Sequence, residues 1–179
     1  MNKDAVILCG GGVGIIPTDT LYGIVGQALK RNTVERIYQL KRRSPLKPFI
    51  ILIGDISDLK QFGITADNTL KTVLDQYWPG PVSVIMDCSD PNLEYLHRGT
   101  NTLAFRLPAK PELTELLRMT GPLVAPSANP EGKLPAKNID DAKAYFDGQI
   151  DFCIKGQVNT KPSKIIKITS DNKEEVIRP

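Results

Sequence analysis

Residues 102–107 have the sequence Thr-Leu-Ala-Phe-Arg-Leu, in which apolar side chains occupy every second position. Because successive side chains of a β-strand point to opposite faces, this alternation predicts a strand. Leu103 and Phe105 would face the core, and the residues beside them would share the opposite face: Thr102, Ala104 and Arg106. A hydroxyl, a small gap and a guanidinium on one face are typical of a substrate surface, although an exposed sheet face has the same pattern.

The rest of the chain alternates short apolar runs with helical periodicity, which indicates an α/β fold. Further strands are expected at Val13–Pro17, Phe49–Ile53, Val82–Cys88, Leu123–Pro126, Ile150–Ile154, Ile165–Ile168 and Glu175–Ile177. Apolar spacing predicts helices after Asn32 (capping box with Glu35), over Asp67–Tyr77, over Pro111–Met119 and after Asn138. Fourteen prolines in short connections favour a mixed sheet surrounded by helices over a regular βαβ repeat.

The composition is that of one domain over residues 1–179. A chain of 179 residues lies within the usual range of about 100–200 residues per domain. With 41% hydrophobic and 24% charged residues it can bury a sizeable core under a polar surface. The net charge of +3 is too small to indicate nucleic-acid binding by itself. Since no apolar run suits a signal peptide or a membrane span, we expect a cytoplasmic protein with no membrane partner.

Several kinds of site are not supported. Cys9, Cys88 and Cys153 are widely spaced and form no C-x-x-C pair, so we expect reduced thiols, not a disulfide framework or a zinc site. Gly10–Gly14 lacks the Gly-Lys-Ser/Thr of a P-loop and precedes a strand, so we interpret it as a turn. His97, the only histidine, is interpreted as a loop residue and not as a base. No metal site is predicted.

A cluster of cations follows the first long helical pattern. Four of the seven residues in Lys41–Lys47 are lysine or arginine. Cations at a helix C-terminus favour the helix dipole and are well solvated, so the segment has a purely structural explanation. The alternative is a polyphosphate clamp, in which arginine supplies a two-pronged donor and lysine a point charge.

Two further segments follow predicted strands and are candidates for a ligand site. Ser127–Asn129 lies between Pro126 and Pro130, beyond the carboxyl end of a strand, where α/β folds often bind ligands. The same residue types also favour ordinary turns. Pro17–Gly23 is polar and aromatic at the end of an apolar strand, a position in which loops often carry function. Together with the cationic cluster, these segments predict an anionic, nucleotide-like ligand.

Seven segments resemble, in order and over nearly the whole chain, the motifs of the YrdC/Sua5 family of L-threonylcarbamoyladenylate synthases. They are Pro17–Gly23, Ile37–Arg43 with Lys47-Pro48, Trp78–Pro81, Ala104–Pro108, Pro126–Pro130, Pro162-Ser163 and Arg178-Pro179. Each motif is weak by itself, but the ordered set is specific. Since the sequence ends at Pro179, we expect the short YrdC form.

The resemblance implies a YrdC-like fold, a single-domain twisted mixed sheet with surrounding helices and a large basic cleft. It also implies a reaction that joins L-threonine, bicarbonate and ATP into threonylcarbamoyl-AMP and pyrophosphate, for the t6A37 modification of tRNA. ATP would contact Arg43, Lys47, Thr102, Asn129 and Arg178, and threonine would contact Thr20, Arg106, Ser127 and Ser163. Lys41 and Arg43 would act in catalysis by neutralising charge at the reacting phosphate, with Mg²⁺ accompanying ATP. The adenylate would pass to tRNA-modification proteins.

Within this picture, Lys41–Lys47 and Ser127–Asn129 would form opposite walls of the cleft, with Arg106 between them. The sequence departs from the family pattern at Lys137, Lys164 and Lys167, where hydroxyl or acidic residues are common. The N-terminal helix of relatives is expected to be short or missing.

Two alternatives to the synthase are open. A non-catalytic RNA-binding module could hold tRNA or double-stranded RNA in the same basic concavity, with an affinity that falls steeply with salt. A carbamoyl-transfer domain, like the YrdC-like part of hydrogenase-maturation proteins, is the other. The 179 residues contain neither the zinc-finger nor the acylphosphatase region that accompanies that domain, so we expect this alternative less than the synthase.

Overall fold

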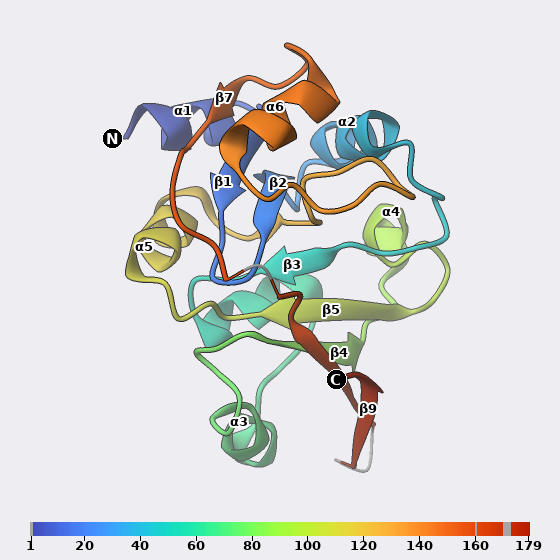
Figure 1. Cartoon of the computed structure of the whole chain (residues 1–179). Helices are drawn as coiled ribbons and strands as arrows, with labels where there is room; N and C mark the ends of the chain where they lie inside the picture. The colour runs from blue at the N-terminus through green and yellow to red at the C-terminus, as the bar shows by residue number, and fades with distance from the viewer. Residues whose placement is uncertain (1, 160, 170–172) are drawn as a thin grey trace.

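A mixed sheet of nine strands organises the described part of the chain, in the order β7-β1-β2-β6-β3-β5-β4-β8-β9 (Figure 1). This computed structural model describes residues 2–159, 161–169 and 173–179. The strands are β1 (Gly14–Pro17), β2 (Tyr22–Gln27), β3 (Ile50–Leu52), β4 (Val82–Asp87), β5 (Thr102–Arg106), β6 (Leu123–Val124), β7 (Phe152–Cys153), β8 (Lys164–Ile168) and β9 (Glu174–Arg178). The pairs β1–β7, β3–β5 and β4–β8 are parallel, and the remaining neighbours are antiparallel.

Helices surround this sheet, which confirms the predicted α/β class with a mixed sheet. The α-helices are α1 (Lys3–Cys9), α2 (Arg31–Lys41), α3 (Asn68–Leu74), α4 (Glu94–His97), α5 (Pro111–Thr120) and α6 (Ile139–Phe146). Two 3₁₀ helices, η1 (Ile56–Phe62) and η2 (Pro91–Leu93), lie in the connections. Among the described residues, no helix has the length and apolarity that crossing a membrane would require.

The core forms two clusters of buried side chains. The larger one contains apolar residues of α2, η1, α4 and α6 packed with sheet residues. The smaller one joins α1 and α5, whose Leu8 and Leu117 are buried, to residues of β1, β2, β3 and β6. In Figure 1 these two helices lie together at the left of the sheet. Burial of Leu103 and Phe105 in the larger cluster confirms the predicted inward face of β5.

Several predicted elements differ in their limits. The expected strands at Leu123–Pro126 and Ile150–Ile154 shorten to the two-residue β6 and β7. The helix expected to end at Tyr77 ends at Leu74. Asn138 caps α6 as predicted, because its Oδ1 accepts a hydrogen bond from the Asp141 amide at 2.8 Å. The N-terminal helix, expected to be short or missing, is the seven-residue α1.

The predicted cap at Asn32 is wrong. Helix α2 begins at Arg31, its N-cap is Lys30, and no side chain caps it. The first turn of α2 is instead held by a residue distant in the sequence. Thr33 is buried there, and its hydroxyl donates to the Gly11 carbonyl at 2.9 Å. Asn32 therefore lies inside the helix, where its side chain cannot act as the cap.

The assignment of His97 to a loop is also wrong. It is the buried last residue of α4. Its Nδ1 accepts a hydrogen bond from the Gly99 amide at 3.2 Å, and its Nε2 lies 3.2 Å from the Asp90 carbonyl oxygen. Both ring nitrogens therefore have main-chain partners, which gives His97 a structural role.

Strand β2 is not expected from the sequence, because Pro17–Gly23 resembles one loop. In the structure the loop is confined to residues 18–21, and Pro17 pairs with Tyr22 across an antiparallel hairpin. Gly26 interrupts the apolar run of β2, but helix α2 requires it. A Cβ at this position would lie 2.4 Å from Cγ2 of Thr33.

Candidate functional site

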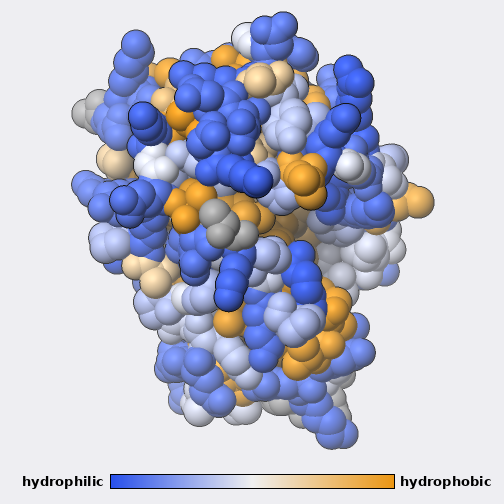
Figure 2. Space-filling view, in the orientation of Figure 1, coloured by the Kyte–Doolittle hydropathy of each residue, from blue (hydrophilic) through white to orange (hydrophobic). Residues whose placement is uncertain are grey.

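A cavity of about 410 Å³ opens where the β1–β2 turn meets β3, β5 and the segments that follow β6 and precede β8. This volume lies within the range of small-molecule sites, roughly 300–1,000 Å³. The space-filling view shows a hollow near the middle of the displayed face, with apolar surface inside it and hydrophilic residues around it (Figure 2). Among the described residues that line the cavity, the charged ones are Arg43, Arg106 and Arg178.

The structure brings together most of the predicted site residues. Seven of them line the cavity: Thr20, Arg43, Thr102, Arg106, Ser127, Ser163 and Arg178. They come from segments far apart in the sequence, which the sheet order brings to one place. Three predicted residues lie outside the lining: Lys41, Lys47 and Asn129.

Strand β5 contributes one complete face to the cavity. Thr102, Ala104 and Arg106 all line it, as the alternation predicted. The backbone of Arg106 is fixed by the parallel pairing with Leu52 of β3, and its carbonyl accepts from the Ile53 amide at 3.0 Å. The guanidinium therefore extends from a rigid strand end and not from a loop.

Arg106 is 3% exposed, and its charge faces one carboxylate at close range. Its Nη2 lies 3.1 Å from Oδ1 of Asp19, in the turn between β1 and β2. Burial lowers the pKa of Arg106 and the positive Arg178 adds to this, whereas Asp19 raises the pKa. The buried guanidinium of Arg106 is thus stabilised in its charged form mainly by Asp19.

A chain of hydrogen bonds joins the edge strand β9 to the cavity wall. The Nε and Nη2 atoms of Arg178 donate to the Ser163 carbonyl at 3.0 and 2.6 Å, and Nη2 also donates to the Ser163 hydroxyl at 3.2 Å. That hydroxyl lies 2.9 Å from the hydroxyl of Ser83 in β4. Burial lowers the pKa of Arg178. Its position is thus set by the residue that precedes β8.

Lys41, which the resemblance places at the reacting phosphate, lies outside the cavity lining. Lys41 is 1% exposed, and its Nζ donates to the carbonyl oxygens of Ser127 and Asn129. Burial lowers the pKa of Lys41 to about 7, and the positive Arg43 contributes to this decrease. The amine lies behind the cavity wall and holds the Ser127–Asn129 loop from inside.

The two segments expected as opposite walls are in fact joined. Besides the Lys41 contacts, the carboxylate of Glu131 accepts from the Ser44 amide at 2.7 Å and from Nζ of Lys47 at 2.5 Å. The largely exposed side chain of Lys47 therefore forms an ion pair at the surface. Asn129 donates through Nδ2 to the carbonyls of Pro130 and Lys133, while its buried Oδ1 has no partner among the described residues.

Arg43 lies on an aromatic support beside the cavity. Its guanidinium carbon is 5.5 Å from the ring centre of Phe49, which stacks on Tyr38 at 3.9 Å. Its Nε donates to the Lys47 carbonyl at 3.2 Å. Since arginine interacts favourably with an aromatic face, this support limits the positions that the side chain can take.

Sequence reasoning missed several cavity residues in the Pro17–Gly23 motif. The Thr18 hydroxyl accepts from the amides of Thr20 and Leu21 and donates to the Leu21 carbonyl, which fixes the turn. The buried Tyr22 lines the cavity, and its hydroxyl donates to the Gly156 carbonyl at 2.5 Å. Asp19 was not selected, because its partner Arg106 is 87 residues away in the sequence. The sequence signal that pointed to these residues was the Pro17–Gly23 motif as a whole.

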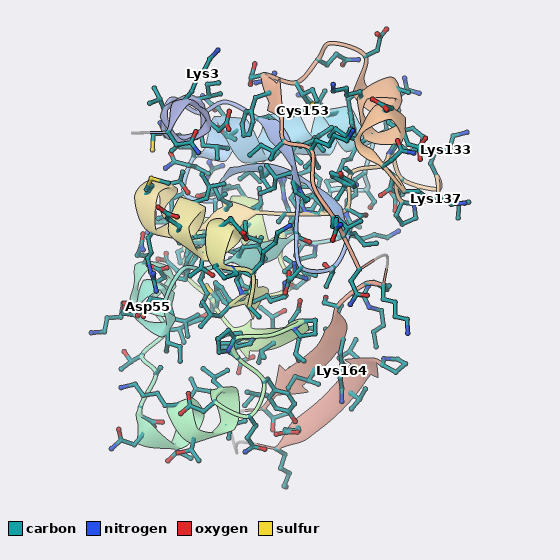
Figure 3. All side chains as sticks on the ribbon, turned by 60° about the vertical axis from the view of Figure 1, so that its left-hand side comes forward. Lys3, Asp55, Lys133, Lys137, Cys153 and Lys164 are labelled. Carbon is teal, nitrogen blue, oxygen red and sulfur yellow. The ribbon has the colours of Figure 1, made fainter. Side chains whose placement is uncertain are left out.

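The three lysines that depart from the family pattern lie around the site, not in its lining. Figure 3 shows Lys164 at β8 and Lys137 in the segment before α6, where Lys133 also lies. Both Lys133 and Lys137 are exposed.

Among the described residues, no group of three or more His, Cys, Asp or Glu side chains is arranged to hold a metal ion.

Comparison with known proteins gives consistent matches. The Sua5/YciO/YrdC family model, described as telomere recombination, matches residues 6–179. The threonylcarbamoyl-AMP synthase of Hahella chejuensis is 33% identical over 170 residues, which are 92% of this chain and 91% of that protein. The synthase of Bacillus subtilis is 33% identical over 154 residues, or 85% of this chain but 44% of that protein. The chain therefore spans less than half of this second relative.

Solved structures show the same similarity. P. abyssi Sua5 complexed with L-threonine has a TM-score of 0.89 and 27% identity, and the match covers 98% of this chain and 52% of that one. E. coli YciO has a TM-score of 0.84 and 25% identity, with 98% and 86% of the two chains covered. The similarity to Sua5 thus covers about half of the longer protein.

Proposed function

This chain belongs to the Sua5/YciO/YrdC family, and from that premise we propose that it is a threonylcarbamoyl-AMP synthase. The substrates would be L-threonine, bicarbonate and ATP, with Mg²⁺ bound to the nucleotide phosphates. One observation carries the proposal: the charged residues that line the cavity are three arginines, accompanied by the hydroxyls of Thr20, Ser127 and Ser163 among others. An anionic nucleotide and a small hydroxy amino acid fit this combination of groups.

The proposed mechanism depends on positioning and charge. Forming the product places a carbamate anion against the α-phosphate of ATP, and the repulsion between these anions must be offset. Arg43 and Arg178 are proposed to neutralise the phosphates, with Thr102 as a hydroxyl donor on the same strand face as Arg106. No covalent intermediate with the protein is needed, because orientation of the two reactants lowers the barrier.

At the threonine end, we assign the carboxylate to Arg106, whose planar fork suits a carboxylate. Thr20, Ser127 and Ser163 would bind the remaining polar groups of the amino acid. Lys41 is assigned a positioning role, since its amine holds the main chain of Ser127 and Asn129. Asn129 and Lys47 would reach ATP only where it extends beyond the cavity lining.

The test is pyrophosphate release by the purified chain. We expect release that requires L-threonine, bicarbonate and ATP together, with threonylcarbamoyl-AMP detected by mass spectrometry. Arg43→Ala should abolish the reaction and keep the fold, whereas Lys71→Ala, which removes an exposed cation on α3, should leave the rate unchanged. A folded preparation that releases no threonine-dependent pyrophosphate would contradict the proposal.

The product is proposed to pass to proteins that modify tRNA at position 37, in the cytoplasm. RNA binding is a second candidate, favoured by the exposed Lys133 and Lys137 on either side of the cavity residue Pro135. Reversing both lysine charges should then weaken tRNA or double-stranded RNA binding and reduce its salt dependence. RNA affinity that does not change with salt or with these charges would contradict this candidate.

A further inference from the structure

The ion pair between Asp19 and Arg106 lacks the hydrogen bonds that buried ionic groups normally form. The two side chains are almost fully buried, with 4% of Arg106 and 11% of Asp19 exposed. Neither oxygen of the Asp19 carboxylate, nor Nε of Arg106, has a hydrogen-bond partner among the described residues. Since buried polar atoms are satisfied in most proteins, this arrangement calls for an explanation.

The turn that carries Asp19 is rigid, so the missing hydrogen bonds are not a consequence of a loose loop. Thr18 accepts from the amides of Thr20 and Leu21 and donates to the Leu21 carbonyl, while Pro17 and Tyr22 pair across the hairpin. The carboxylate is therefore held 3.1 Å from the Arg106 guanidinium by the backbone on its own side.

As a result, Asp19 compensates the charge of Arg106 by an ion pair with Nη2 and forms no hydrogen bond with it. No hydrogen bond from the Arg106 guanidinium is found among the described residues, and Arg106 lines the cavity. The guanidinium therefore keeps hydrogen-bonding capacity for a ligand carboxylate. Asp19 itself is outside the lining, between Thr18 and Thr20, which are both part of it.

The charges around the cavity show what Asp19 changes. Without it, the ionic groups at the lining are arginines alone, and they would attract any anion and repel an ammonium group. Among the described residues, the other carboxylate that acts on an arginine of the site belongs to Glu131, which is exposed and paired with Lys47. Asp19 places a buried negative charge beside the cavity, and interactions between charges are strongest where water is excluded.

We propose that Asp19 is a specificity-determining residue, whose buried carboxylate makes this end of the cavity prefer a zwitterionic α-amino acid over a simple carboxylate anion. Arg106 binds the carboxylate of the ligand, and the negative potential of Asp19 favours the ammonium group next to it. The inference rests on the proposed function, in which L-threonine occupies this end of the cavity.

The experiment compares two ligands by calorimetry on the purified chain. L-Threonine carries both charges, whereas (R)-3-hydroxybutyrate keeps the carboxylate, hydroxyl and methyl groups and lacks the ammonium. We expect the wild type to prefer L-threonine by at least about tenfold. In Asp19→Asn this preference should fall by about tenfold, because threonine binds more weakly while the simple anion binds equally well or better.

Two controls separate this role from a structural one. Asp19→Glu keeps the charge and should keep the preference, and Asp75→Asn removes an exposed carboxylate at the C-cap of α3 and should change neither affinity. A loss of affinity that is equal for both ligands in Asp19→Asn would overturn the inference, because damage to the site affects both. If Asp19→Asn does not fold, equal binding of both ligands by the wild type, or loss of the preference in Asp19→Glu, would still overturn the inference.

The failure of this inference can be distinguished from failure of the proposed function. A wild type that binds both ligands equally overturns the role of Asp19 and leaves the synthase standing. A folded wild type that binds no L-threonine, and releases no threonine-dependent pyrophosphate, overturns the proposed function and this inference with it.

Discussion

The amine of Lys41 donates to the main-chain carbonyl oxygen of Asn129 at 2.5 Å, from the last residue of helix α2 into the loop that follows β6. The same nitrogen donates to Ser127, so one buried side chain fixes both ends of a three-residue segment of the cavity wall. The return contact comes from the Glu131 amide, which donates to the Lys41 carbonyl at 2.8 Å. The loop and the helix end therefore behave as one unit.

Lys41→Met should destabilise the fold. The substitution removes the donor shared by two buried carbonyl oxygens, and a buried acceptor without a partner costs about 1–3 kcal/mol. We expect the free energy of unfolding, measured by urea denaturation, to fall by about 2–4 kcal/mol. Lys47→Met removes a cation of the same cluster that is largely exposed, and it should change stability little. Equal effects of the two substitutions would contradict the buried role of Lys41.

Lys41 should also give stability a specific pH dependence. Its pKa is about 7 in the folded chain and near 10.5 when exposed. Between these values the unfolded chain binds more protons than the folded one, so the free energy of unfolding rises with pH. The penalty for burying the charge is full below pH 7 and is gone above 10.5. The wild type should therefore gain stability relative to Lys41→Met across this window, and a constant difference would refute the prediction.

Arg178→Lys should weaken ATP binding without unfolding the protein. Lysine keeps the charge but cannot reproduce the donors that reach the Ser163 carbonyl and hydroxyl together. If the misplaced cation loses one charge-assisted hydrogen bond to ATP, the loss of about 1.5–3 kcal/mol corresponds to about a ten- to hundredfold rise in the Kd for ATP. Calorimetry measures this Kd, and the thermal midpoint reports the fold. Unchanged ATP affinity would show that the charge of residue 178 suffices.

Gly26→Ala should destabilise the contact between β2 and α2. The new Cβ would lie 2.4 Å from Cγ2 of Thr33 and 3.1 Å from Cδ1 of Ile37. Overpacking of this kind costs about 1–3 kcal/mol. Adding Thr33→Ser removes the clashing methyl group and keeps the hydroxyl that donates to Gly11. The double variant should recover part of the stability in thermal denaturation. An absence of recovery would show that the clash is not with Thr33.

The sequence by itself determined the features that depend on local pattern. The alternation in β5 gave the correct inward and outward faces, because a strand's side-chain period is a property of the backbone. The Asn138 cap was also found, since it depends on residues three apart. The ordered motifs led to seven of the ten predicted site residues in the cavity lining and to a family that the comparisons show.

The tertiary structure alone decided which cations reach the cavity. Lys41, Arg43 and Lys47 lie in one short basic segment, yet the first is buried behind the wall, the second lines the cavity and the third pairs at the surface. Their environments come from loops about 85 residues away, such as Ser127 and Glu131, which local sequence cannot report. The same holds for Asp19, whose significance depends on Arg106. Charge and spacing are local properties, whereas burial and pairing arise only when distant segments pack together.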